Sequence, residues 1–412
     1  MLRIFTNERQ TTIYIEFLYI DPAIFCGAFL MNKHTIIENK IVKHQALTFD
    51  DILLLPNYTE LKRGDVDIGT VLHPKLVLKL PIVSSPMDTV TEEVMAIALG
   101  KAGGLGIIHR NMAVGKQAAM IEKVKKVKNI DRKSAAVDAK GKLLVGAAVG
   151  AGVDLDERVK ALVQAGVDVL CVDSSHGHSK FIMGIVSSIR KKYKGLPLMA
   201  GNVATYDGTR ALIDAGADII RVGMGPASIC TTRIISGMGV PQISAVSAAV
   251  RATEGSKATI IADGGIRQIG DMAKAFAFGA NTVMLGSLLG GFDESPGKVI
   301  IVKGKKYKSY RGMGSVSAMK KGGAERYGQK RNTDEKKLIA EGVEGLVAYK
   351  GKVEDYFYQV AGSLRTSLYY LGSKNWKTFF ETSRVIKIST AGLLESHPHE
   401  VTIVDPGRNY RV

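Results

Sequence analysis

Cysteine is scarce in this chain of 412 residues, which contains only Cys26, Cys171 and Cys230. The number is odd, and the spacing matches neither a zinc site nor a Cys-x-x-Cys motif, so a disulfide framework is not expected. Such cysteine usage is typical of a protein that works in a reducing cytoplasm. The length suffices for one large domain or for two or three smaller ones.

A long uninterrupted apolar run is also missing. The nearest candidate, 11–31, contains two acidic residues and a proline, which argues against a membrane-spanning helix. No compact apolar segment leads to a small-residue cleavage site, so a secretory signal is not expected. Because Met31 resembles an alternative start, we expect residues 1–30 to lie outside the folded domain, within an N-terminal extension of 1–43.

Acidic residues are outnumbered, 39 against 56 Lys and Arg, which gives a formal net charge of +17. A basic chain suits an anionic partner, but basic and aromatic residues do not alternate here as they do in nucleic-acid platforms. Lysines cluster only locally, at 123–133 and 303–308. The charge therefore does not favour nucleic acid as a partner, and a nucleotide substrate would need only one local pocket.

What the sequence does contain is an alternation of short apolar runs with amphipathic stretches. Because the runs are apolar on both faces, they predict buried parallel strands. The runs are 82–85, 105–109, 143–149, 168–173, 196–203, 218–223, 258–263 and 281–286. A doubly wound sheet would share this alternation, but eight units without an open-sheet fingerprint favour an α/β fold of the (β/α)8 TIM-barrel type.

An internal repeat supports the barrel. The segment 161–173 recurs at 211–223 and, more weakly, at 275–286. Each copy reads as a helix end, a glycine that ends the helix, and a buried strand. The glycines are Gly166, Gly216 and Gly279.

The C-terminal ends of the predicted strands carry small and polar residues, and this is where barrels of this type place their active sites. The clearest signals are Gly264-Gly265 after the seventh strand and Gly286-Ser287 after the eighth. Backbone N–H groups of these two loops often bind phosphate. A tight turn alone would also require glycine, but glycine at both positions predicts a phosphate-bearing substrate.

Cys230 lies in the polar, glycine-rich segment 223–242, which follows the sixth strand. A lone cysteine is more often a small buried apolar residue, and we interpret Cys171, inside a strand run, in that way. At the catalytic end of a barrel, however, a thiolate on a polar loop could attack an electrophilic ring carbon. Cys230 is therefore the candidate nucleophile.

Several long motifs resemble those of the inosine-5′-monophosphate (IMP) dehydrogenase family. They are 46–56 (ALTFDDILLLP), 83–91 (VSSPMDTVT), 223–233 (GMGPASICTTR), 262–266 (ADGGI), 310–319 (YRGMGSVSAM), 326–327 (RY), 341–345 (EGVEG) and 395–399 (ESHPH). The resemblance covers roughly residues 44–400 and leaves 401–412 as a tail. It implies NAD-dependent oxidation of IMP to xanthosine monophosphate (XMP), the committed step of guanine nucleotide synthesis.

The resemblance also implies roles for individual residues. Cys230 would attack carbon 2 of the purine, and Thr232, Arg326 and Tyr327 would assist hydrolysis of the adduct. IMP would be bound by Ser85, Met87, Ser228, Asp263, Gly264, Gly265, Gly286, Ser287, Tyr310, Gly312, Met313, Gly314 and Glu341. NAD would be bound by Asp173, Ser174, Ser175, Asn202, Gly223, Met224 and Gly225.

A mobile catalytic flap is implied for residues 305–350 and would carry Arg326-Tyr327 into the site that NADH leaves. Arginine is normally too basic to accept a proton from water, so Arg326 could act as a base only where its charge is disfavoured. Without the resemblance, we would interpret it as an exposed flap charge.

A potassium ion is implied as well. Its ligands would be carbonyl oxygens of Gly225, Ala227 and Cys230, completed by a neighbouring subunit in a homotetramer, or in an octamer. The neighbour would supply Glu395, Ser396 and His397.

The sequence departs from the family at three places. Ala227 stands where glycine is usual, which raises a question about the loop backbone, and Gly328 stands where an aromatic residue is common. Only a short linker, 121–142, lies where the family usually inserts two nucleotide-sensing CBS domains, so we expect no allosteric response through them.

Two alternatives stay open at this point. GMP reductase, which uses NADPH, shares the barrel and the cysteine loop, but it lacks the Arg–Tyr pair and typically reads Gly-Met-Ser-Ser at 312–315. A catalytically inactive scaffold or nucleic-acid-associated paralogue is supported only by the positive charge.

Overall fold

The computed structural model describes residues 40–42, 45–329, 334–405, 407 and 409–410. Contacts divide the chain into a unit of residues 1–45 and a unit of residues 46–412. The expectations for 1–30, and nearly all of those for 1–43, lie outside the described residues. Every helix and strand between Phe49 and Glu395 belongs to the second unit.

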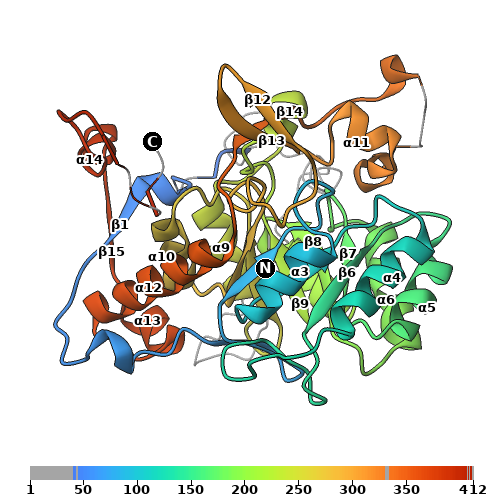
Figure 1. Ribbon diagram of the computed structural model, residues 1–412, viewed down its shortest axis with the longest axis horizontal. Coiled ribbons are helices and arrows are strands. Elements are labelled where there is room, and N and C mark those ends of the chain that lie inside the picture. The colour runs from blue at the N-terminus through green and yellow to red at the C-terminus, as the bar shows by residue number, and fades with distance from the viewer. Residues whose placement is uncertain (1–39, 43–44, 330–333, 406, 408, 411–412) are drawn as a thin grey trace, which may run out of the picture. The chain divides into compact units, whose positions relative to one another are not determined.

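Eight parallel strands close into a barrel, as the apolar runs predicted (Figure 1). They are β4 (Ile82–Ser84), β5 (Leu105–Ile108), β6 (Val145–Val149), β7 (Val169–Asp173), β8 (Leu198–Val203), β9 (Ile219–Val222), β10 (Thr259–Asp263) and β11 (Thr282–Leu285). Each strand pairs with its neighbour in the sequence, and β11 pairs with β4 to close the ring, with Leu285 opposite Ser84. The (β/α)8 prediction is confirmed.

Helices follow the strands and cover the outside of the barrel. They are α3 (Glu93–Lys101), α4 (Val114–Lys125), α5 (Leu155–Gln164), α6 (Lys180–Lys192), α7 (Tyr206–Asp214), α8 (Thr232–Ile235) with α9 (Gln242–Ala252), α10 (Ile269–Ala277) and α12 (Glu354–Leu371). The glycines of the repeat follow α5, α7 and α10 with positive φ, +88° at Gly166, +105° at Gly216 and +90° at Gly279. These left-handed positions end the helices and turn the chain into the next strand, as predicted.

Two apolar cores hold the barrel together. The larger lies between the strands and the helices, and the smaller fills the barrel interior with side chains such as Val83, Ile107 and Met284. The hairpin of β2 (Thr70–His73) and β3 (Leu76–Leu78) packs Leu72 and Leu76 into the interior core just before β4 begins. The N-terminal end of the barrel is therefore closed by apolar side chains.

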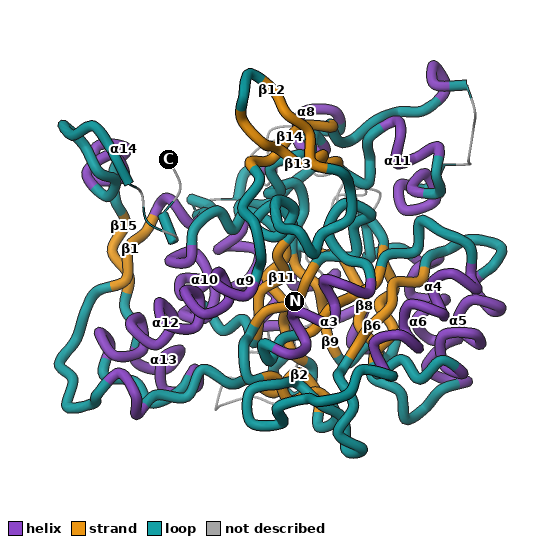
Figure 2. The backbone as a smooth tube through the Cα atoms, in the orientation of Figure 1, coloured by secondary structure: helices purple, strands orange, loops and turns teal. Residues whose placement is uncertain are grey.

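A separate sheet rises above the C-terminal ends of the barrel strands, between β11 and α12 (Figure 2). It contains β12 (Val299–Val302), β13 (Lys305–Arg311) and β14 (Glu344–Ala348), and it carries α11 (Val316–Lys320), η3 (Gly323–Tyr327) and η4 (Glu335–Lys337). The sheet thus begins before the expected flap boundary at residue 305. A bidentate ion pair from Arg311 to Asp88, with N···O distances of 3.0 and 2.5 Å, fixes its base to the barrel.

The ends of the second unit meet outside the barrel. Strand β1 (Ile52–Leu54), preceded by η1 (Phe49–Asp51), pairs with β15 (Val385–Lys387). Three further elements complete the unit: η2 (Arg63–Asp65), α13 (Trp376–Thr382) and α14 (Thr390–Glu395). Among the described residues, no helix has both the length and the apolar character that crossing a bilayer requires.

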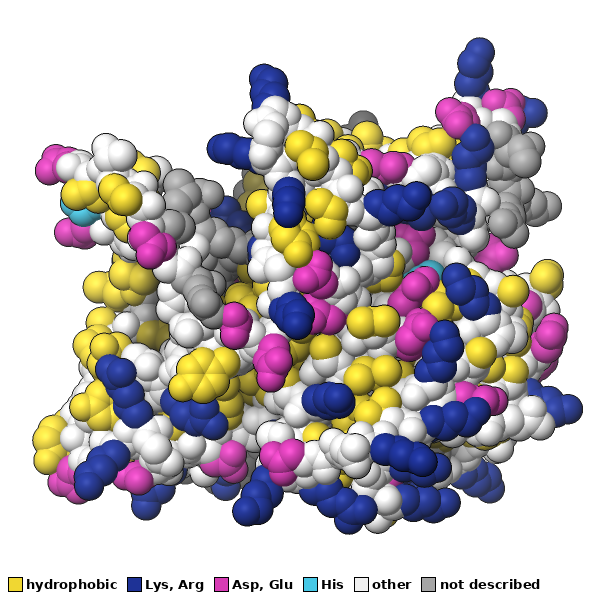
Figure 3. Space-filling model, viewed as in Figure 1, with side chains coloured by type: hydrophobic (Ala, Val, Ile, Leu, Met, Phe, Trp, Pro, Cys, Tyr) yellow, Lys and Arg dark blue, Asp and Glu magenta, His cyan; other side chains and the backbone are white. Residues whose placement is uncertain are grey.

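The segment between β5 and β6 contains no additional domain. Helix α4 extends to Lys125, inside the expected linker 121–142, and the remaining residues form a short turn closed by a bridge between Val137 and Leu143. No CBS pair lies between these two strands. On the face shown in Figure 3, Lys and Arg side chains are spread among acidic ones over the helices.

Close packing of α3 on β5 leads to a test of the fold. A Cβ atom at Gly106 would lie 2.6 Å from both the Cα and the Cβ of Ala96, so Gly106→Ala should lower the free energy of unfolding by about 1–3 kcal/mol through overpacking. Gly362, in α12, has nothing within 4 Å of the same position, so Gly362→Ala should instead stabilise by about 0.5–1 kcal/mol. Denaturant unfolding measures both, and equal effects would contradict the packing described.

Candidate active site

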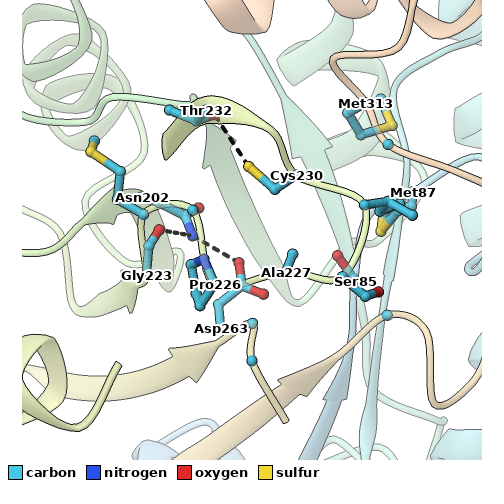
Figure 4. Close-up of a pocket in the computed structure, with 18 of the residues that line it drawn as sticks. Ser85, Met87, Asn202, Gly223, Pro226, Ala227, Cys230, Thr232, Asp263 and Met313 are labelled. Atoms are coloured by element: carbon cyan, nitrogen blue, oxygen red, sulfur yellow. Dashed lines mark hydrogen bonds between the residues drawn. The ribbon is translucent and has the colours of Figure 1, made fainter. Parts of the chain in front are cut away.

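One pocket opens at the C-terminal end of the barrel beneath the flap, and most predicted site residues line it (Figure 4). All four predicted catalytic residues do so, as do all the predicted IMP residues except Gly314. The predicted NAD residues do so except Asp173 and Ser174, which are buried beside it. Residues 395–397 are exposed on α14 and just beyond it.

Cys230 is positioned by the flap as well as by its own loop. The Val343 N–H donates to the Ile229 carbonyl and the Thr231 N–H donates to the Glu341 carbonyl, both at 3.0 Å, so the loop pairs with the returning flap strand. The Cys230 thiol is half-buried and donates to Thr232 Oγ1 at 3.2 Å (Figure 4). The sulfur therefore lines the pocket from a loop that is held by two backbone hydrogen bonds to the flap and by the Cys230–Thr232 contact.

Hydroxyl groups gather at the glycine turns that predicted phosphate binding. The Tyr310 hydroxyl, from β13, donates to Met87 Sδ at 3.8 Å, and Ser228 and Ser287 line the same pocket. A Cβ on Gly286 would lie 2.7 Å from the Tyr310 oxygen, so only glycine allows this approach. Burial raises the pKa of Tyr310, which keeps its proton for donation to an anion. Three loops thus converge on one place with hydroxyl and backbone donors.

Arg221 links two acidic side chains at the base of the pocket, Asp173 and Asp263. This residue was not identified from the sequence. Its guanidinium is 1% exposed, donates to Asp173 at 2.5 Å and to Asp263 at 2.7 Å, and projects from the middle of a barrel strand. Asn202 adds a bond of 2.9 Å to Asp263 and one of 3.0 Å to the Gly223 carbonyl. A lone arginine in the apolar run 218–223 was the available signal, because an unpaired buried charge is costly.

Other pocket residues were also missed. They are Pro226, Ile229, Ile266, Arg267 and Met284. Their types are common in loops and strands, so nothing in the sequence singles them out.

The flap places Arg326 against the barrel. Its guanidinium forms an ion pair with Asp173, and its carbonyl accepts hydrogen bonds from the N–H and hydroxyl of Ser175 at 3.0 and 2.9 Å. Burial alone would raise the pKa of Asp173, but Arg326 and Arg221 outweigh it and hold the pKa at about 2. Burial would lower the pKa of Arg326, yet Asp173 leaves it raised.

Tyr327 lies beside Arg326, and burial raises its pKa to about 12. Both flap groups therefore keep their protons in this arrangement. The condition for Arg326 to act as a base, a disfavoured charge, is not met while it contacts Asp173.

The two residue departures have local explanations. Gly328 has φ +67° and ends η3, a conformation that suits glycine better than an aromatic residue. Ala227 is not among the described residues with positive φ, so the methyl group introduces no backbone strain there. Its carbonyl accepts the Cys230 N–H at 3.0 Å.

The Arg221 network leads to a prediction about stability. Arg221→Met should cost about 3–5 kcal/mol, because it removes one charged partner from the buried Asp173 and one from Asp263. Arg210→Met is the control, since its exposed pair with Asp214 should contribute under about 1 kcal/mol. The stabilisation from Asp173 should be complete above about pH 4 and lost as pH falls towards 2, because its folded pKa lies below its unfolded value. Thermal unfolding across this pH range measures both effects, and equal losses for the two variants would refute the assignment.

Comparisons with known proteins agree with the geometry. Residues 46–399 match the model of the IMP dehydrogenase / GMP reductase domain. The chain is 45% identical to an inosine-5′-monophosphate dehydrogenase of Borreliella burgdorferi over 88% of this chain and 98% of that protein. A protein of the same name from Cryptosporidium parvum is 44% identical, over 89% and 98%. Another from Bacillus subtilis is 38% identical, over 91% and 99%. The chain belongs to the IMP dehydrogenase / GMP reductase family.

Proposed function

We propose that this chain oxidises IMP to XMP with NAD through a covalent bond to Cys230. The observation that carries the proposal is a single pocket that combines the thiol, the hydroxyl cluster at the glycine turns and the flap pair Arg326-Tyr327. The three relatives all bear the name of the dehydrogenase, and the Arg–Tyr pair lines the same pocket as the Cys230 thiol. Both observations favour the dehydrogenase over GMP reductase.

The pocket suits a purine nucleotide. Tyr310, Ser228 and Ser287, with the N–H groups of the glycine turns, would bind the phosphate. Asp263, held by Arg221 and Asn202, would accept hydrogen bonds from the ribose hydroxyls. Gly312, Met313 and Glu341 line the flap side and would contact the base.

The first half-reaction would begin at Cys230. Its thiolate adds to carbon 2 of the purine and forms a carbon–sulfur bond, and the hydrogen of that carbon then leaves with its electron pair. Bound NAD supplies the acceptor for this hydride. Thr232, in contact with the sulfur, would accept the thiol proton on its way to solvent.

The NAD subsite overlaps the place that the flap occupies in this structure. Ser175, Asn202, Gly223, Met224 and Gly225 line the pocket, and the Asn202 side-chain oxygen is buried without a partner, as a binding group would be. Yet Ser175 binds the carbonyl of Arg326, and Asp173 binds its guanidinium. The same groups would serve the nicotinamide ribose first and the flap afterwards, so the flap is proposed to be mobile.

The second half-reaction would be hydrolysis with the flap in place. Water adds to carbon 2, the carbon–sulfur bond breaks, and XMP and the Cys230 thiol are released. Since Asp173 keeps Arg326 charged here, proton removal by Arg326 requires that it first leave Asp173. Until then Arg326 and Tyr327 can orient the water and exclude solvent.

Replacement of Cys230 tests the chemistry. Cys230→Ala should abolish NADH formation from IMP and NAD, at least about 10³-fold, because no covalent intermediate can form. The measurements are NADH absorbance and mass spectrometry of acid-quenched wild-type enzyme. Peptide mapping should place the nucleotide on Cys230 and not on Cys171, which is fully buried. Turnover by the alanine variant, or no adduct on the wild type, would refute the proposal.

The same proposal includes a potassium site and a homotetramer. An octamer made of two tetramers is compatible with it. Backbone carbonyls of Gly225, Ala227 and Cys230 lie on one loop, and a hard cation prefers oxygen ligands. Among the described residues, no group of three or more His, Cys, Asp or Glu side chains is placed to bind a metal ion. Residues 395–397 are exposed at the end of α14 and just beyond it, and a neighbour's copy would complete the site. A cytoplasmic location is part of this proposal.

Glu395 provides the test of the shared cation site. Glu395→Ala should raise the potassium concentration needed for half-maximal activity about tenfold, because one charged ligand is lost. Glu381→Ala, another exposed carboxylate in the C-terminal part, is the control and should leave it unchanged. An activity that does not depend on potassium, or identical titrations for the two variants, would contradict the site.

A further inference from the structure

Glu325, the residue before the Arg–Tyr pair, forms a second ion pair between the flap and the barrel. Arg110, just after β5, donates from its guanidinium to Glu325 Oε2 at 3.1 Å. The Arg110 side chain is 8% exposed and that of Glu325 34% exposed. Because the arginine of this pair is buried, the pair is worth more than one between two exposed side chains.

Two glycines of the loop after β6 make room for this pair. A Cβ at Gly150 would lie 2.3 Å from the central carbon of the Arg110 guanidinium. A Cβ at Gly152 would lie 2.5 Å from Glu325 Oε2. Neither Gly150 nor Gly152 has positive φ, so the backbone conformation does not require glycine at these positions. What the two glycines provide is space for the charged groups of Arg110 and Glu325.

Two neighbouring flap residues of opposite charge each pair with a barrel residue of the complementary charge. Glu325 meets Arg110, and the next residue, Arg326, meets Asp173. Arg110 also acts on Asp173, whose pKa it lowers after the larger effects of burial, Arg326 and Arg221. The second terminal nitrogen of the Arg110 guanidinium is buried and has no hydrogen-bond partner. In the described chain, Glu325 is the only carboxylate that forms an ion pair with Arg110. When the flap leaves, Arg110 loses this compensation.

We propose that the Arg110–Glu325 pair is a latch that sets the fraction of time the flap is closed, and with it the division of the enzyme between NAD binding and hydrolysis. Glu325 is thus a positioning residue that acts through Arg326. The inference rests on the proposed function, because it requires that the flap and NAD use the same groups in turn.

Glu325→Gln tests the latch. It should reduce the closed-to-open ratio about tenfold, the loss expected for one charge-assisted hydrogen bond. Hydrolysis should therefore slow and the XMP adduct on Cys230 should accumulate, while inhibition by excess NAD should strengthen. The first hydride transfer, followed as the NADH burst in a single turnover, should not change.

Gly152→Ala tests the same latch with both charges retained. Its methyl group displaces the Glu325 carboxylate, so it should reproduce the kinetic pattern of Glu325→Gln. Glu335→Gln is the matched control, because Glu335 pairs with Lys320 inside the flap and does not touch the barrel. In a double-mutant cycle, Glu325→Gln should add little once Arg110 is Met.

The outcomes are distinguishable. Wild-type enzyme that makes no NADH from IMP would refute the proposed function and the latch with it. An active wild type with the same adduct fraction and NAD inhibition in Glu325→Gln as in Glu335→Gln would refute the latch alone. A slowed NADH burst would show that Glu325 acts before flap closure, which would also overturn it.

Discussion

The carboxylate of Asp173 is the contact on which the rest of the site depends. It lies at the end of β7, 3% exposed, and it accepts Arg221 from inside the barrel and Arg326 from the flap. Taking a carboxylate out of water is costly unless it is paired. One buried charge therefore requires an arginine beneath it and accepts a second from above, and this connects the barrel to the flap.

The flap depends on such polar contacts because its own apolar core is small. Among its described residues, Met319, Ala324 and Leu338 form a small buried cluster, whereas the barrel contains two large ones. A segment with little buried apolar surface opens at a low cost in free energy. Its ion pairs with Asp173 and Arg110 can then determine whether it is closed, and the bidentate pair from Arg311 to Asp88 keeps its base attached.

Much of the barrel could be predicted because its signal is local. Each apolar run contains its own strand, and Gly166 or Gly216 marks where a helix must end. The site could be located for a similar reason, since strand ends meet at one face of a barrel. Individual roles came mostly from the family resemblance, because Arg326 alone looks like an exposed charge.

Pairings between distant residues could not be read from the sequence. Arg110 and Glu325 are separated by 215 positions, and nothing near either one indicates the other. Arg221 did stand out as a charge in an apolar strand, but its two acidic partners are the last residues of two other strands, β7 and β10. The proposed potassium ligands leave even less trace, because backbone carbonyls have no residue signature.

Hydrogen–deuterium exchange of the flap in Asp173→Asn tests the central claim most directly. Asparagine keeps the shape of the side chain but removes the charge that Arg326 contacts. Amides of 316–327 should then exchange faster than in the wild type, while those of β5 and β6 should stay equally protected. Unchanged protection of 316–327 would show that the flap is held by something other than this carboxylate.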